Sequence, residues 1–206
     1  MKRISTLLAF LALGTIHVSA QERATTESGR KVILNPNGTW QPESKKESSS
    51  NTGVGFKRPE TSTEKLTFNR GTISVYFNPN IWKKKSQEEP NRVQLQHKDG
   101  DGYALILAER MELPIDALKN LALTNAKNAA PDAHITLDEK RRVNGVDVTV
   151  LQIKGTIQGI PFIYYGYYYA GKDGCIQILN YTAQNLFDDY KADFLDFLNG
   201  FTVEPK

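Results

Sequence analysis

The chain has few of the residues that build metal centres, disulfide frameworks or nucleophilic active sites. Its 206 residues include one cysteine, Cys175, and three histidines. A single cysteine excludes an intramolecular disulfide. His97 and His134 have no further histidine, cysteine or glutamate at the close spacing typical of zinc ligands. Phosphate-binding glycine loops and the G-x-S-x-G and H-E-x-x-H motifs are also missing. We therefore expect no cofactor, no metal ion and no catalytic residue.

Catalysis is left open by this argument, although the sequence favours a protein without enzymatic activity. The alternative is a small envelope hydrolase that uses carboxylate and tyrosine groups in a cleft of the sheet. Such chemistry requires two carboxylates that face each other, roughly 5–10 Å apart for the hydrolysis of sugars. The acidic residues Asp132, Asp138 and Glu139 follow no pattern that identifies such a pair.

Neither a strong charge imbalance nor a long apolar run is present. The chain carries 26 Lys and Arg residues against 23 Asp and Glu residues. Nucleic-acid binding requires a clustered basic face, so this balance predicts no nucleic-acid partner. The one sustained apolar run, Leu7–Val18, is shorter than the ~20 residues of a membrane-spanning helix. We therefore expect no transmembrane segment in the mature chain.

The N-terminus has the three parts of a secretory signal peptide. Lys2 and Arg3 precede the apolar run, and Val18 and Ala20 are the small residues expected three and one positions before a cleavage site. Cleavage before Gln21 removes residues 1–20. The sequence therefore predicts an exported protein, periplasmic or secreted.

A small hairpin and a linker are predicted between the leader and the main domain. In residues 21–44, the stretch NPNG after Leu34 is typical of a tight turn between two short strands. Residues 45–65 are rich in Ser, Thr, Lys and Glu and predict a flexible, disordered linker. An isolated two-stranded hairpin is marginally stable. We therefore expect the hairpin to dock, either on its own domain or on a partner in the cell envelope.

Residues 66–206 predict one α+β domain with a mostly antiparallel sheet. Strand-like runs lie on either side of Arg70-Gly71, on either side of the turn Asp99–Gly102, and in four consecutive segments between 133 and 182. Apolar residues at helical spacing predict one helix over 114–129 and another over 186–199. Tight turns between consecutive strands favour antiparallel pairing, and two amphipathic helices must pack on the sheet.

Two stretches of the main domain resemble PsbP-like domains. ISVYFNPNIW, which ends at Trp82, resembles the strand followed by Pro-x-x-Trp that opens such domains, and RRVNGVDVTVLQ resembles their central Asn-Gly turn and outgoing strand. The likeness covers about Leu66–Val203. It implies an antiparallel sheet with helices on both faces, an α-β-α sandwich, and a binding or assembly role. GRKVILNPNGTW, within the hairpin, resembles a short element of exported bacterial proteins.

The stretch IPFIYYGYYYAGKDGCIQILNYT, residues 160–182, holds six of the nine tyrosines. In a strand, Phe162, Tyr164 and Tyr168 share one face while Tyr165, Tyr167 and Tyr169 share the other. Apolar residues on both faces indicate a strand inside a covered sheet. A platform that stacks bases or sugars would instead need one open face.

The candidate ligand-binding residues are therefore few. They are Tyr165, Tyr167 and Tyr169, whose hydroxyls are expected at a sheet margin or pocket wall, together with Trp82. The function expected is that of a non-enzymatic binding or assembly module of the bacterial cell envelope. Its partner is an unknown protein or envelope component, and the chain itself is expected to be a monomer.

Overall fold

The computed structural model describes residues 22–25, 31–34, 40–42, 56–85, 89 and 91–204. The chain divides into two compact units, residues 1–52 and 53–206. The predicted signal peptide and the first half of the predicted linker, 45–55, lie outside the described residues. Within the described part, each helix is too short or too polar to cross a bilayer.

The first unit contains a small antiparallel sheet. Its strands are β1 (Glu22–Thr25), β2 (Lys31–Leu34) and β3 (Trp40–Pro42), in the order β1-β2-β3. β2 and β3 form a hairpin in which Leu34 is opposite Trp40. β1 adds a strand that the sequence pattern did not predict.

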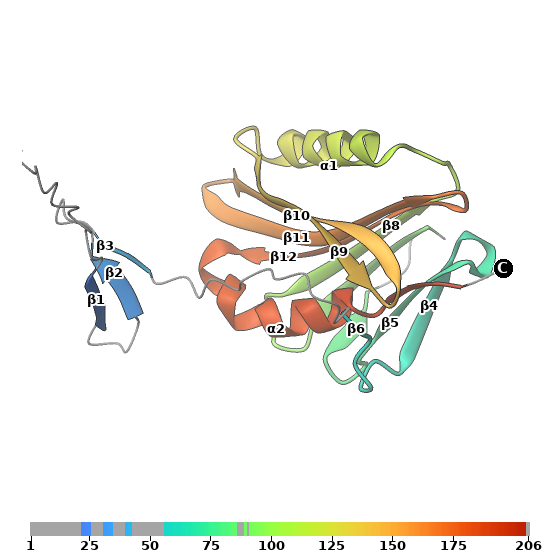
Figure 1. Ribbon diagram of the computed structural model, residues 1–206, viewed down its shortest axis with the longest axis horizontal. Coiled ribbons are helices and arrows are strands. Elements are labelled where there is room, and N and C mark those ends of the chain that lie inside the picture. The colour runs from blue at the N-terminus through green and yellow to red at the C-terminus, as the bar shows by residue number, and fades with distance from the viewer. Residues whose placement is uncertain are drawn as a thin grey trace, which may run out of the picture. The chain divides into compact units, whose positions relative to one another are not determined.

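The second unit contains ten strands and two α-helices among its described residues (Figure 1). In chain order these are β4 (Glu64–Phe68), β5 (Ile73–Phe77), β6 (Trp82–Lys84), β7 (Arg92–His97), β8 (Tyr103–Glu109), α1 (Ile115–Ala129), β9 (His134–Val143), β10 (Val146–Ile157), β11 (Ile160–Gly171), β12 (Gly174–Ala183), α2 (Phe187–Leu198) and β13 (Phe201–Val203). Each strand pairing between these elements is antiparallel. The predicted α+β class and antiparallel sheet are confirmed.

The strands of the second unit form two sheets. The main sheet has seven strands in the order β6-β7-β8-β12-β11-β10-β9, and a smaller sheet has the order β13-β5-β4. The meander β9–β12 follows α1 in the chain. Its last strand, β12, lies beside β8 and pairs with it. Sequence patterns predict eight of these strands and miss the short strands β6 and β13. They do not predict the order, since the β8–β12 pairing is a long-range contact.

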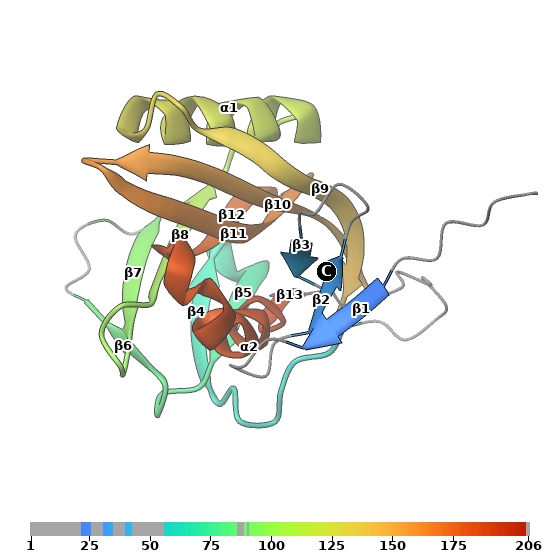
Figure 2. The same ribbon diagram turned by 90° about the vertical axis from the view of Figure 1, so that its left-hand side faces the viewer.

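Alternate side chains of β11 belong to the two different hydrophobic clusters of the second unit. Tyr168 packs with Leu118 and Ala122 of α1. Tyr165 and Tyr167 pack with the aromatic side chains of α2, among them Phe194. Figures 1 and 2 show α1 lying along β9, β10 and β11. The two alternating sets of β11 side chains therefore belong to different clusters, one with α1 and one with α2.

The second half of the predicted linker lies within the second unit. The amide of Phe56 donates to the carbonyl of Arg142 at 3.0 Å, and the amide of Asn144 donates to the carbonyl of Phe56 at 2.8 Å. Ser62 is buried, and β4 begins at Glu64. The few apolar side chains in this stretch predict a linker, whereas the backbone of Phe56 and the bond from the Arg58 amide to Oδ1 of Asn144 hold this segment against the turn after β9.

Candidate functional site

Two of the predicted tyrosines converge on one arginine. Nη1 of Arg141, on β9, donates to the hydroxyls of Tyr165 and Tyr167 at 3.2 Å each. The hydroxyl of Tyr167 donates to Oδ1 of Asn199 at 2.9 Å. Both tyrosine side chains are buried. Burial raises the pKa of Tyr167 to about 12, although the neighbouring Arg141 acts in the opposite direction.

The guanidinium of Arg141 is enclosed on several sides. Nη2 forms an ion pair with Glu139, and the guanidinium carbon lies 4.3 Å from the centre of the Phe56 ring. Its donors are therefore directed at side chains of the same unit, and only 12% of the side chain is exposed. This cluster joins the edge strand β9 to β11 and to the residue that follows α2. Its geometry is that of a structural clamp.

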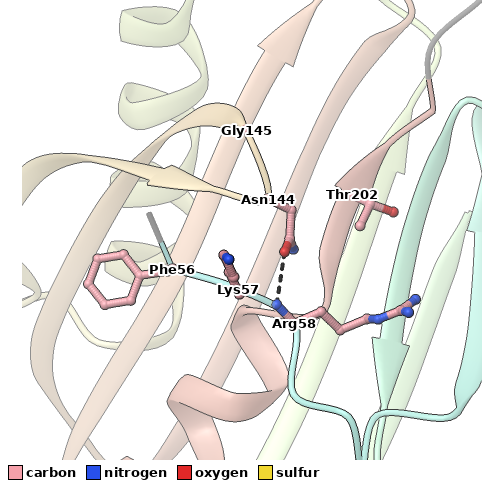
Figure 3. A pocket seen from close by; sticks show the side chains of 6 residues that line it. All are labelled: Phe56, Lys57, Arg58, Asn144, Gly145 and Thr202. Atoms are coloured by element: carbon pink, nitrogen blue, oxygen red, sulfur yellow. Dashed lines mark hydrogen bonds between the residues drawn. The ribbon is translucent and has the colours of Figure 1, made fainter. Parts of the chain in front are cut away.

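A shallow hollow of about 480 Å³ lies beside this clamp (Figure 3). Phe56, Lys57, Arg58, Asn144, Gly145 and Thr202 line it. The side chain of Asn144 is fully engaged, since its Oδ1 accepts from the amide of Arg58 at 2.8 Å and its Nδ2 donates to the carbonyls of Asn199 and Phe201 at 2.7 Å each. The lining includes no carboxylate, and Asn144 is its one side chain with several hydrogen bonds, whereas the hydroxyl of Thr202 is buried without a partner among the described residues.

The other two predicted residues lie elsewhere. Tyr169 is half-buried and packs against Phe201, with ring centres 5.4 Å apart. Trp82 is 2% exposed and packs among His97, Phe194 and Phe197. The structure brings Tyr165 and Tyr167 together at Arg141, whereas Trp82 belongs to the same hydrophobic cluster but contacts other rings. A ligand-binding role for any of the four stays a prediction.

The surroundings of His97 and Cys175 indicate structural roles for both side chains. Nε2 of His97 lies 3.0 Å from Oδ2 of Asp193 on α2, and its Nδ1 accepts from the amide of Asp99 at 3.2 Å. The contact with Asp193 attaches the β7–β8 hairpin to α2, and the bond from Asp99 lies within the turn of the hairpin. Cys175 is buried, and burial raises the pKa of its thiol. Among the described residues, no group of three histidine, cysteine or acidic side chains is placed to hold a metal ion.

Aromatic and aliphatic side chains remain partly exposed on the face of the main sheet that α1 partly covers. We call this set the aromatic surface. It consists of Tyr103, Leu105, Leu107, Phe162, Tyr164, Leu179 and Tyr181. Its two flanking amides are Gln94 and Gln96 on β7, also partly exposed. α1 lies against β9, β10 and β11, which leaves the β7–β8–β12 side of the same face less covered.

The aromatic surface is ordered by strand register. Tyr164, Tyr181 and Tyr103 are directly opposite one another on β11, β12 and β8. The rings of Tyr103 and Tyr181 are stacked, with centres 5.1 Å apart and an interplanar angle of 18°. The rings of Tyr164 and Tyr181 are 5.6 Å apart. Gln94 donates to the hydroxyl of Tyr181 at 2.8 Å, which fixes that ring.

Sequence reasoning missed this surface because it depends on pairing. Tyr103 is distant in sequence from the tyrosine-rich stretch, and only the β8–β12 register places it beside Tyr181. The alternation of β11 assigns Tyr164 and Tyr168 to one face, but it does not reveal that α1 buries Tyr168 and leaves Tyr164 partly exposed. A binding platform requires one open face of the sheet, and the aromatic surface is partly exposed on such a face.

Comparison with solved structures shows the fold. The cyanobacterial PsbP protein (CyanoP) of Synechocystis sp. PCC 6803 matches with a TM-score of 0.55 at 13% identity, over 75% of this chain and 99% of that one. A Pseudomonas aeruginosa protein of unknown function, PA94, described as a putative regulator, and the Saccharomyces cerevisiae Ran-binding protein Mog1p have TM-scores of 0.46 and 0.47 at 9% and 6% identity. They cover 69% and 68% of this chain, and the matches span 98% and 94% of their own lengths.

Sequence comparison gives no match to a family model or to a curated protein. At 13% identity, the likeness to CyanoP establishes a PsbP-like fold and does not transfer a function.

Proposed function

We propose that this protein is an exported, non-enzymatic binding module of the bacterial cell envelope, and that it binds through the aromatic surface. One observation carries the proposal, namely the partial exposure of seven contiguous apolar side chains on three neighbouring strands. Exposed apolar patches of this kind commonly mark interaction sites. The envelope address rests on the predicted signal peptide.

The α-β-α sandwich predicted for this domain is part of the same proposal. The likeness to CyanoP and the packing of α1 and α2 with side chains of opposite parity on β11 support helices on both faces of the main sheet. In such a sandwich an incompletely covered face is a natural binding surface, since the strands below it are held rigidly by the core.

A hydrolase is the less favoured function. It requires a pair of carboxylates facing a cleft, whereas the hollow beside Asn144 is lined by two cationic side chains and no acid. The buried tyrosines donate to or accept from Arg141 and Asn199, which are neighbours that hold the fold.

Affinity capture from the native envelope tests the proposal. We expect the purified mature protein to recover an envelope component that the double variant Tyr103→Ser, Tyr181→Ser does not recover. Both side chains are partly exposed, so circular dichroism should show that the variant remains folded.

The matched control is Leu121→Ser, because Leu121 is 42% exposed on α1 and lies outside the aromatic surface. This variant should recover the same component as the wild type. Equal recovery by the wild type and the double variant would contradict the assignment of the aromatic surface, and recovery of nothing by any of them would contradict a binding function.

A further inference from the structure

We infer that the aromatic surface recognises an acidic segment of a partner protein, rather than a stacked sugar or base. The inference rests on the proposed function and names the chemistry of the partner. It depends on two independent observations, which are the orientation of the rings and the charge at one margin of the surface.

The ring faces of the central tyrosines are already in use. Two rings that lay flat and side by side on the sheet would not bring their centres within 5.1 Å, so Tyr103 and Tyr181 stand upright and overlap. Nζ of Lys85 lies 5.2 Å from the centre of the Tyr103 ring. Tyr181 has Tyr103 on one side and Tyr164 on the other. These rings therefore present edges and hydroxyls outward, which disfavours stacking by a flat ligand.

Upright tyrosines suit a protein interface. Tyrosine is enriched among the residues that contribute most to protein–protein binding, because it combines a large rigid apolar body with a polar hydroxyl. The hydrogen bond from Gln94 to Tyr181 holds one of these hydroxyls in place before any partner arrives. Leu105, Leu107 and Leu179 supply apolar area next to the rings. A protein segment with its own apolar side chains fits this combination.

The margin of the surface on β6 and β7 is basic. Lys83 is opposite Gln96, which is opposite Tyr103, so the row of tyrosines leads directly to a lysine. Lys85 and Arg92 are exposed at the same margin. Within the described chain, no ion pair neutralises these three cations. Glu89 lies beside Arg92, and two further acids near these strands, Glu64 and Asp99, pair with Lys84 and Lys98. The margin that Lys83, Lys85 and Arg92 form therefore has a net positive charge, which complements carboxylates.

Two synthetic peptides test the inference on the full mature chain. Both have the same alternating pattern of leucine and tyrosine with a charged residue, which is glutamate in one and lysine in the other. Nuclear magnetic resonance of the labelled protein should place the glutamate peptide on β7, β8 and β12. We expect it to bind about tenfold more tightly than the lysine peptide, and its affinity should fall as salt is added.

Charge reversal supplies the matched comparison. The triple variant Lys83→Glu, Lys85→Glu, Arg92→Glu should lose the tenfold preference. The control reverses three exposed lysines elsewhere, Lys127→Glu, Lys140→Glu and Lys172→Glu, and should keep the preference because these residues lie outside the basic margin. Thermal unfolding of both variants checks that they are folded.

Each outcome decides the inference. Preference for the glutamate peptide at the aromatic surface supports it. Equal binding of both peptides, or tighter binding of a hexasaccharide of N-acetylglucosamine used as the sugar probe, overturns the acidic-segment inference while leaving a binding function in place. Resonance changes at another surface overturn it as well. Failure of the proposed function itself appears separately, as loss of all capture from the envelope.

Discussion

The side chain of Asn144 joins three segments that are far apart in the sequence. The residue occupies the left-handed region at φ 48° in the Asn-Gly turn between β9 and β10, which suits a two-residue hairpin. From there it binds the amide of Arg58 and two carbonyls after α2. Turn statistics explain an asparagine here, but they do not explain the three hydrogen bonds.

Asn144→Asp should therefore be far more harmful than its place in a turn implies. Aspartate tolerates this backbone conformation, but its carboxylate would face the carbonyls of Asn199 and Phe201 that the amide now binds. We expect a loss of about 2–3 kcal/mol in the free energy of unfolding, measured by urea denaturation.

The control for this prediction is Asn78→Asp. Asn78 accepts from the amide of Asn80 through its side-chain oxygen, which aspartate retains. This change should cost less than about 0.5 kcal/mol. Similar losses in the two variants would show that the bonds of Asn144 to the chain after α2 are unimportant.

Tyr167 should make the protein sensitive to alkaline pH. Its pKa of about 12 in the folded state lies above the ordinary value of about 10, so the folded state retains the proton longer than the unfolded state does. The stabilisation is complete below pH 10 and is lost as the pH rises from 10 towards 12, by about 3 kcal/mol in total.

Tyr167→Phe removes the contribution of Tyr167 to this dependence on pH, whereas other tyrosines whose pKa is raised by burial keep theirs. The variant should be less stable at neutral pH by about 1–2 kcal/mol, because Asn199 and Arg141 lose a buried partner. Its urea midpoint should then fall less steeply than that of the wild type between pH 10 and 12. Parallel curves for the two proteins would refute the assignment of this titration to Tyr167.

At the scale of elements, α1 has a narrow apolar contact with the main sheet. Leu118, Ala122 and Ala126 are its buried residues, and Ile115 and Leu123 pack against the same cluster while partly exposed, so Leu118 is its one large side chain that is fully buried. The sequence predicts this face from helical spacing. Only the structure shows that so thin a face leaves part of the sheet incompletely covered.

Leu118→Ala should destabilise the protein by about 2–5 kcal/mol, the usual cost of removing a fully buried leucine. Leu121→Ala, on the exposed side of the same helix, should cost less than about 0.5 kcal/mol. Thermal and urea unfolding would measure both. A small effect at Leu118 would mean that other contacts hold α1. The narrow apolar face of α1 would then not explain why the aromatic surface is incompletely covered.

At the scale of the whole molecule, the second unit contains its own core. Both hydrophobic clusters among the described residues are formed by side chains between Phe68 and Phe201. The stability of this unit should therefore be independent of the segment that precedes it.

Deletion of residues 21–44 from the mature chain tests this independence and the attachment hypothesis together. We expect the urea midpoint of the remaining protein to be unchanged. If the hairpin attaches the protein to the envelope, fractionation of the cells should show altered localisation. Unchanged fractionation would reject the attachment hypothesis, and a lower urea midpoint would show that the hairpin stabilises the second unit.

The sequence by itself determined most elements of the second unit and the two-sided burial of β11. Periodicity and turn residues are local properties, so they predicted α1, α2 and the meander from β9 to β12, and alternation separated Tyr164 and Tyr168 from Tyr165 and Tyr167. The tertiary structure alone decided which of these tyrosines are exposed. Exposure depends on the pairing of β8 with β12 and on the extent of α1 over the sheet. Both arise from contacts between residues far apart in the chain, for which local patterns contain no information.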